Sequence, residues 1–184
     1  MKKTLVIVAH PDINNSIINK CWIEKLHQYP EQFTVHELYQ SYPNAQIDVL
    51  KEQALVEAHQ NLVFQFPVYW FNCPPLLKQW LDDVLTYGWA YGSVGNQLKN
   101  KKITLAVSTG SKAHDYSVDG RHQVSLETLC APFELTARYV KADYQPVYAF
   151  YGMETQPEEG EVLPTINDVE QSAEDYVKYL LAMH

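Results

Sequence analysis

Three segments of the sequence carry side chains suited to binding a phosphorylated or flat ligand, and each directly follows a short apolar run. They are His10-Pro11-Asp12-Ile13-Asn14-Asn15-Ser16-Ile17-Ile18-Asn19, then Pro67-Val68-Tyr69-Trp70-Phe71-Asn72-Cys73-Pro74, and Ser108-Thr109-Gly110-Ser111 with its continuation to His122. Hydroxyl, amide and imidazole groups can bind phosphate, and aromatic rings can flank a heterocycle. The three segments therefore predict a ligand site if the fold brings them together.

The first segment leads into a predicted helix, whose free N–H groups and dipole favour a phosphate. Asn14 and Asn15 could adopt left-handed conformations in place of glycine, and Ser16 could cap the helix and donate its hydroxyl to phosphate. A plain N-cap with a turn explains the same residues equally well. No glycine precedes Gly88, so neither the G-x-G-x-x-G nor the Walker A pattern is present.

The second and third segments point to a flat ligand. Tyr69, Trp70 and Phe71 follow a strand, where aromatic side chains can flank a ring, although packing in the core would also account for them. Ser108, Thr109 and Gly110 offer hydroxyls and an unencumbered backbone to a ring or a ribityl chain.

The elements that must position these segments alternate between strands and helices. Apolar runs predict strands at 3–9, 33–38, 61–66, 102–107 and 145–150, with a loop at 38–43. Helices are predicted at 15–29, at 46–58 with Ile47, Leu50, Ala54, Leu55 and Ala58 on one side, from Pro74-Pro75 to Leu85, and at 166–181 after a capping box of Thr165 and Asp168. This order predicts one α/β domain over 1–184, a flavodoxin-like three-layer αβα sandwich whose five-stranded parallel sheet has the order 2-1-3-4-5. In such a sheet the ligand site lies at the carboxyl ends of the strands.

Composition narrows the function. The 184 residues contain 14 Lys plus Arg and 22 Asp plus Glu, a formal charge of −8 that disfavours nucleic acid as a partner. No apolar run reaches the roughly 18 residues that a membrane-spanning helix needs. The three cysteines form no metal-binding pattern and are expected to be small buried hydrophobes in a reducing, cytoplasmic compartment.

Together the three loops resemble the flavodoxin-like NAD(P)H:quinone reductase family over nearly the whole chain. Within it the sequence is most similar to the bacterial branch that contains the ancillary proteins of glutathione-regulated potassium efflux. The marks of that branch are Leu38-Tyr39 through Tyr42-Pro43 with Ile47-Asp48, then Pro74-Pro75-Leu76-Leu77-Lys78, and Tyr87-Gly88-Trp89-Ala90-Tyr91-Gly92.

The resemblance implies FMN, rather than FAD, bound without a covalent link. It places the phosphate and ribityl chain at His10, Ser16, Ile17, Ile18 and Asn19, and the isoalloxazine ring against Pro67, Val68, Tyr69, Trp70, Phe71, Ser108, Thr109, Gly110 and Ser111. Tyr116 and His122 fall where better-known members keep a tyrosine and a histidine that stabilise charge and relay a proton. The resemblance also implies a homodimer, in which Tyr87, Trp89 and Tyr91 cover the partner's site.

The implied activity is ping-pong transfer of a hydride from NADPH or NADH, through the flavin, to a quinone or another small electrophile. Three alternatives stay open. An electron-carrier flavodoxin would share the fold and the acidity, and a binding module without flavin would be colourless. A regulatory subunit would dock on a potassium-efflux transporter at the inner face of the cell membrane, and that role is compatible with reductase activity.

Overall fold

A parallel sheet with helices on both faces forms the protein. The computed structural model describes residues 4–154, 160 and 162–183. The strands are β1 (Thr4–Val8), β2 (Phe33–Glu37), β3 (Asn61–Pro67), β4 (Lys102–Ser108), β5 (Asp143–Tyr144) and β6 (Tyr148–Phe150). The helices are α1 (Ile17–Leu26), α2 (Leu38–Ser41), α3 (Val49–Glu57), α4 (Pro75–Val84), α5 (Leu126–Leu129), α6 (Ala131–Tyr139) and α7 (Ile166–Ala182), with 3-10 turns at Ile13–Asn15 and Ala113–Asp115.

The strand order is β2-β1-β3-β4-β5, with β6 also paired to β4, and every pairing is parallel. This confirms the predicted order 2-1-3-4-5 and the flavodoxin-like fold. Only the second half of the predicted fifth strand at 145–150 forms a strand, which is β6. The two-residue strand β5 lies just before the predicted range, and β5 and β6 pair with opposite ends of β4. Lys3, the first residue of the predicted first strand, lies outside the described residues.

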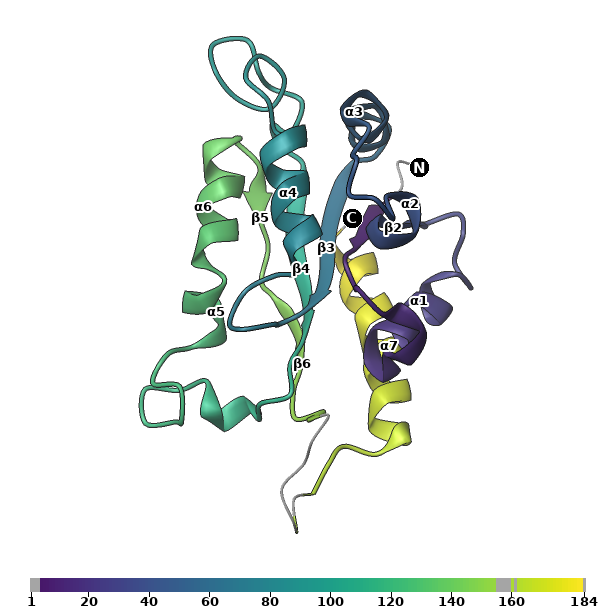
Figure 1. The fold of residues 1–184 in the computed structure, drawn as a ribbon, viewed down its shortest axis with the longest axis vertical. Coiled ribbons are helices and arrows are strands. Elements are labelled where there is room, and N and C mark those ends of the chain that lie inside the picture. The colour runs from purple at the N-terminus through teal and green to yellow at the C-terminus, as the bar shows by residue number, and fades with distance from the viewer. Residues whose placement is uncertain (1–3, 155–159, 161, 184) are drawn as a thin grey trace.

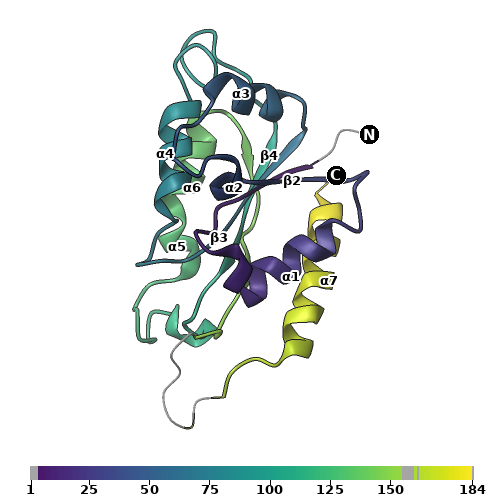
Figure 2. The ribbon, with the colours of Figure 1, turned by 45° about the vertical axis from the view of Figure 1, so that its right-hand side comes forward.

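The central strands are apolar because both of their faces are covered (Figure 1). Along β1, Leu5 and Ile7 enter the core beneath α4 and α6, whereas Val6 and Val8 enter the core beneath α1 and α7. Figure 2 shows α4, α5 and α6 gathered on one side of the sheet and α1 with α7 on the other. The sheet therefore presents its carboxyl edge between two helical layers, where a ligand can enter.

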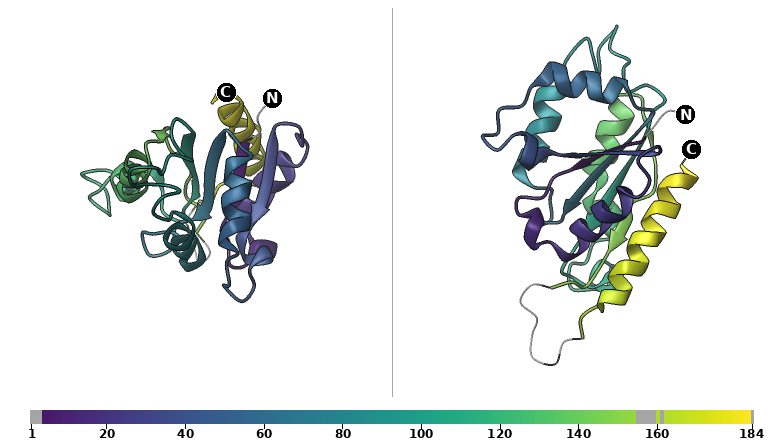
Figure 3. Two further views of the ribbon diagram at one scale, coloured as in Figure 1. Left: turned by 90° about the horizontal axis from the view of Figure 1, so that it is seen from above. Right: turned by 90° about the vertical axis from the view of Figure 1, so that its right-hand side faces the viewer.

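Helix α7 supports α1 through aromatic packing. Trp22 is fully buried, with ring centroids 4.9 Å from Tyr176 and 5.4 Å from Tyr148, and its indole N–H donates to Ser172 Oγ at 2.9 Å. Both views in Figure 3 show the last helix beside the first one. The predicted capping box at the start of α7 is confirmed, since the side chains of Thr165 and Asp168 each accept a backbone N–H from the other residue.

Two local predictions were wrong. The predicted loop 38–43 contains the single-turn helix α2, which forms because Leu38 and Tyr42 are both buried in the core. Helix α3 does not bury the predicted apolar side: Leu50 is 79% exposed, and Glu52 is completely buried instead.

Helix α3 can bury Glu52 because distant residues satisfy its carboxylate. His36 Nε2 and the Tyr42 hydroxyl contact Oε1 at 2.9 and 2.6 Å, and the Trp80 indole N–H donates to Oε2 at 2.8 Å. Burial alone would raise the pKa of Glu52, but these hydrogen bonds and the nearby His36 lower it below its ordinary value. A buried, ionised carboxylate thus joins β2, α2, α3 and α4.

The cysteines are all free, and Cys130 is buried as expected. Cys21 and Cys73 are only partly buried, so the expectation of three buried cysteines holds for one of them. Within the described residues, no helix combines the length and apolar character needed to span a bilayer.

Candidate functional site

A cavity of about 950 Å³ opens at the carboxyl edge of the sheet, where the topology predicts the ligand site. The loops after β1, β3 and β4 all contribute to it. Every residue predicted for the site lines this cavity: His10, Ser16, Ile17, Ile18, Asn19, Pro67, Val68, Tyr69, Trp70, Phe71, Ser108, Thr109, Gly110, Ser111, Tyr116 and His122. Their contact with a cofactor stays a prediction.

The N-terminus of α1 forms one corner of the cavity. Ser16 is the N-cap, and its Oγ accepts the N–H of Asn19 at 3.2 Å, as predicted. The N–H groups of Ile17 and Ile18 have no acceptor within the helix, because they belong to its first turn. The corner therefore offers backbone donors to an anion.

His10 lies beside that corner as a neutral donor. Burial lowers its pKa below the ordinary histidine value, and the nearby Asp12 offsets only part of this effect. The N–H of Asp12 donates to His10 Nδ1 at 3.1 Å, so the ring proton is on Nε2 in the neutral form. An imidazole in this tautomer can donate a hydrogen bond through Nε2.

The left-handed backbone conformation that was predicted after the first strand occurs instead in the loop after β3. Asn14 and Asn15 lie in a 3-10 turn without positive φ, whereas Trp70 and Phe71 have φ of 47° and 60°. They are the central residues of a tight turn in which Tyr69 and Asn72 exchange both backbone hydrogen bonds, at 2.9 and 3.0 Å. Bulky aromatic residues rarely adopt this conformation, and such strain tends to gather at functional sites.

A buried hydrogen-bond network forms the floor between β3, β4 and α1. Gln65 Nε2 donates to the backbone oxygen of Asn19 at 3.2 Å, and Asn19 Nδ2 donates to Ser108 Oγ at 2.8 Å. Ser108 therefore accepts on the protein side, and its own O–H is left to donate elsewhere. This network links the N-terminal helix to the end of β4.

Tyr116 and His122 lie together, as the resemblance implied. Their ring centroids are 4.8 Å apart, the Tyr116 hydroxyl is 2.8 Å from Thr109 Oγ1, and His122 Nε2 is 2.9 Å from Ser111 Oγ. Phe71 meets His122 edge-on, with ring centroids 5.0 Å apart. The loops after β3 and β4 thus close on each other at one wall of the cavity.

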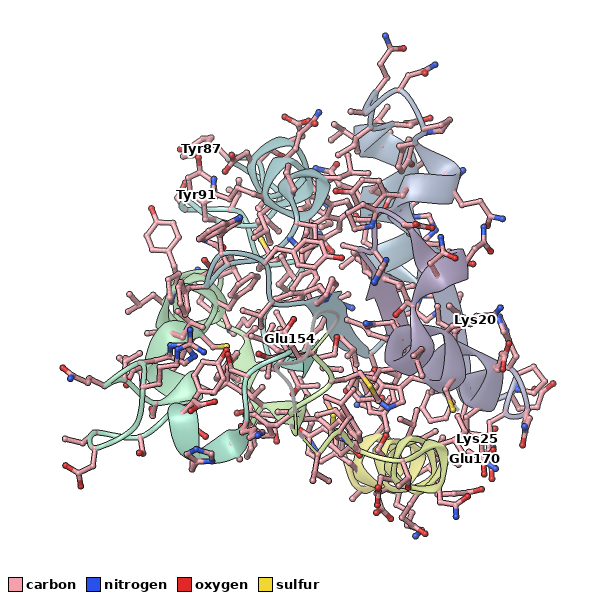
Figure 4. All side chains as sticks on the ribbon, turned by 60° about the horizontal axis from the view of Figure 1, so that its bottom comes forward. Lys20, Lys25, Tyr87, Tyr91, Glu154 and Glu170 are labelled. Atoms are coloured by element: carbon pink, nitrogen blue, oxygen red, sulfur yellow. The ribbon has the colours of Figure 1, made fainter. Side chains whose placement is uncertain are left out.

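The aromatic residues 87, 89 and 91 do not line the cavity of their own chain. Tyr87 is 69% exposed and packs edge-on against Tyr91 with ring centroids 5.8 Å apart, while the Trp89 indole donates to Glu57. Figure 4 shows Tyr87 and Tyr91 together at the margin of the molecule, well away from Glu154. Coverage of a partner's site stays a prediction.

Five further residues line the cavity. Asp12, Asn15 and Arg121 lie within the predicted segments but were not assigned a contact with the ligand, whereas Met153 and Glu154 lie outside those segments. Met153 and Glu154 follow the carboxyl end of β6, so the topological rule would have identified them had it been applied to the last strand as well. Gly110 lies against Glu154, whose Oε2 would be 2.9 Å from a Cβ built on the glycine. A side chain at residue 110 would therefore displace the carboxylate of Glu154.

A doubly wound parallel sheet with this edge cavity defines the class: a flavodoxin-like α/β protein. The profile of the Flavodoxin_2 family, described as having a flavodoxin-like fold, matches residues 2–177, so the chain belongs to that family.

Three relatives illustrate the range of the family. The uncharacterized NAD(P)H oxidoreductase YrkL of Bacillus subtilis is 46% identical over 182 residues, 99% of each chain. The potassium-efflux ancillary protein KefG of Cronobacter sakazakii is 40% identical over 149 residues, 81% of this chain and 80% of KefG. The crystal structure of general stress protein 14 from Treponema denticola, in complex with FMN, is 52% identical with a TM-score of 0.91 over 99% of each chain.

Proposed function

We propose that the protein is an FMN-dependent NAD(P)H:acceptor oxidoreductase of the cytoplasm. One observation carries the proposal: the cavity joins an anion-binding helix terminus to an aromatic turn and to the Tyr116–His122 pair, all in one chain. Its likeness to the FMN complex of general stress protein 14 and to the oxidoreductase YrkL supports the same reading.

The residues of the cavity fit FMN. Its volume of about 950 Å³ is at the upper end of the range for cofactor sites, which leaves room for a second ligand. The N–H groups at the start of α1 and the neutral His10 suit the phosphate, and the aromatic turn suits one side of a flat ring. We propose FMN rather than FAD because general stress protein 14 of Treponema denticola, which is 52% identical, is in complex with FMN.

In this proposal His10 and residues 16–19 hold the phosphate and ribityl chain. Residues 67–71 and 108–111 would hold the isoalloxazine ring. The Ser108 hydroxyl, which accepts from Asn19, is left as a donor toward the ligand. Trp70 and Phe71 line the cavity and would cover one side of the ring.

When bound, FMN would supply hydride transfer from NAD(P)H to a second substrate, and a shared pocket makes the turnover ping-pong. The protein stabilises negative charge on the ring with backbone N–H groups and holds a proton at Tyr116 and His122. These two side chains suit that role because each is fixed by a hydroxyl partner, Thr109 for Tyr116 and Ser111 for His122. We propose a quinone or another small electrophile as acceptor and a homodimer as the active assembly.

Docking on a potassium-efflux transporter is the second candidate, and the likeness to KefG favours it. We favour the reductase function over the docking function because YrkL matches over 99% of each chain, whereas KefG matches over 81% of this chain. Co-purification with a transporter from membranes of the source cell would support the second role. A transporter whose activity is indifferent to the protein would exclude it.

The test of the main proposal is direct. The purified protein should show a flavin spectrum, alone or after addition of FMN, and should oxidise NADH or NADPH when menadione is present. Failure to bind any flavin would refute the proposal. A flavin-loaded protein that oxidises neither donor would instead support an electron carrier.

A further inference from the structure

The chain has two arginines, and they differ in whether another residue binds the guanidinium group. Arg138 lies on α6 and forms an ion pair with Glu134, one turn earlier on the same helix. Arg121 lines the cavity with an exposed side chain and has no hydrogen bond or ion pair to any other residue that the structure describes. Its guanidinium is thus available to a ligand.

The loop that carries Arg121 is anchored on both sides of it. The N–H of His122 donates to the backbone oxygen of Asp115 at 3.0 Å. Gly120 packs so closely on the same segment that a Cβ would lie 2.2 Å from the His114 oxygen and 2.7 Å from the Asp115 oxygen. The backbone at residue 121 is therefore held in place, and the loop directs an exposed cation to the cavity.

The positive charge of Arg121 stands in a cavity whose other charged lining residues are acidic. Arg121 is the only lysine or arginine among the described residues that line it, and Asp12 and Glu154 line it as well. The whole chain has a formal charge of −8, which repels an anionic ligand at long range. An anion that enters this cavity needs a local positive partner.

In the proposed function two phosphorylated ligands use the same cavity. The start of α1 provides donors for the phosphate of FMN. A nicotinamide dinucleotide brings its own phosphates, and these remain toward solvent when its nicotinamide ring reaches the flavin. Arg121 is exposed, lines the cavity and is adjacent to His122, so its guanidinium is accessible to phosphates on the solvent side.

We propose that Arg121 binds a phosphate of the nicotinamide dinucleotide that donates electrons, an inference that rests on the proposed function. The planar guanidinium can form two parallel hydrogen bonds to phosphate oxygens, a geometry that lysine cannot reproduce. Arg121 thus contributes to the affinity for the donor, and it takes no part in holding FMN.

The test compares Arg121→Ala, Arg121→Lys and the matched control Arg138→Ala in the FMN-loaded protein. Stopped-flow bleaching of the flavin is followed over a range of NADH and of NADPH concentrations. Loss of a charged phosphate contact should raise the half-saturating donor concentration about 10- to 100-fold in Arg121→Ala. The limiting rate and the affinity for FMN should not change, Arg121→Lys should recover part of the loss, and Arg138→Ala should match the wild type.

The two donors locate the phosphate. An equal loss for NADH and NADPH assigns Arg121 to the pyrophosphate, and a loss limited to NADPH assigns it to the 2′-phosphate; either result supports the inference. Unchanged half-saturation in Arg121→Ala for both donors overturns it while leaving the reductase proposal intact. So does an equal loss of affinity for FMN.

A wild-type protein whose flavin neither donor reduces would refute the proposed function instead. Arg121 is then tested by titrating the FMN-loaded protein with NADP⁺, which binds without reacting. Weaker binding to Arg121→Ala than to the wild type supports the inference. Equal binding, or no binding to the wild type, overturns it.

Discussion

Replacing Trp70 by glycine should leave the flavin-free protein more stable than replacing it by alanine. Trp70 has φ of 47° and is 94% exposed, so its indole contributes little burial while its backbone stays in the left-handed region. That region costs a residue other than glycine about 1–2 kcal/mol. Alanine at the same position keeps this cost, so comparing Trp70→Gly with Trp70→Ala isolates the backbone from the side chain.

The expected difference is small but measurable. Glycine relieves about 1–2 kcal/mol of strain and loses roughly 0.5–1 kcal/mol through the greater freedom of the unfolded chain. With midpoints of about 1.5 and 0.75 kcal/mol for these two effects, Trp70→Gly should be more stable than Trp70→Ala by about 0.75 kcal/mol. This difference raises Tm by about 1.5 to 3 °C in a chain of this length.

Urea unfolding and thermal unfolding of the two flavin-free variants provide the measurement. Ala54, which is exposed in the middle of α3, is the matched control because the sign should invert there. The wild-type protein, with alanine at this position, should be more stable than Ala54→Gly by about 0.8–1 kcal/mol. If Trp70→Gly is no more stable than Trp70→Ala, the turn is not strained and the reasoning is wrong. Both Trp70 variants should bind FMN more weakly than the wild type.

Three other predictions concern single side chains. Glu52→Ala should lower the free energy of unfolding, measured in urea, by about 3–5 kcal/mol, because it removes the acceptor of the buried Tyr42 and Trp80 donors and the partner of the partly buried His36. In the wild type, the stability that this carboxylate contributes should disappear as the pH falls below about 4.3 and through its lowered folded-state pKa. That loss should be smaller in Glu52→Gln. The flavin-free protein should lose stability as the pH falls below about 6.5, because His10 takes up a proton in the unfolded chain before it does so in the folded protein. This loss should be smaller in His10→Asn than in the wild type, and an equal loss in both would contradict the lowered pKa of His10. His122→Ala should slow turnover with menadione while FMN remains bound, and unchanged kinetics would remove His122 from the mechanism.

The sequence predicts the order of the sheet and the position of the site because both depend on local patterns. Apolar runs identify the strands, and the right-handed crossover rule orders them. Once the order is known, the loops after β1, β3 and β4 must meet at one edge, which is why the predicted lining residues were found together.

What the sequence did not predict depends on contacts between distant segments. Glu52 is buried only because His36, Tyr42 and Trp80 converge on it from three other elements. The left-handed turn was expected at Asn14 and Asn15, which tolerate it well, and no local preference indicates that Trp70 would adopt it instead. Here the surrounding structure overrides the intrinsic preference of the residues.

The dependence of α1 on α7 has a consequence for how the protein matures in the cell. The indole of Trp22 is buried against Tyr176, so the first helix completes its packing only when the last helix is present. The N-terminus of that first helix supplies donors to the cavity. A nascent chain on the ribosome has made this corner of the cavity long before it has made the helix that secures it, so we expect the corner to reach its final packing only after the last helix has been synthesised.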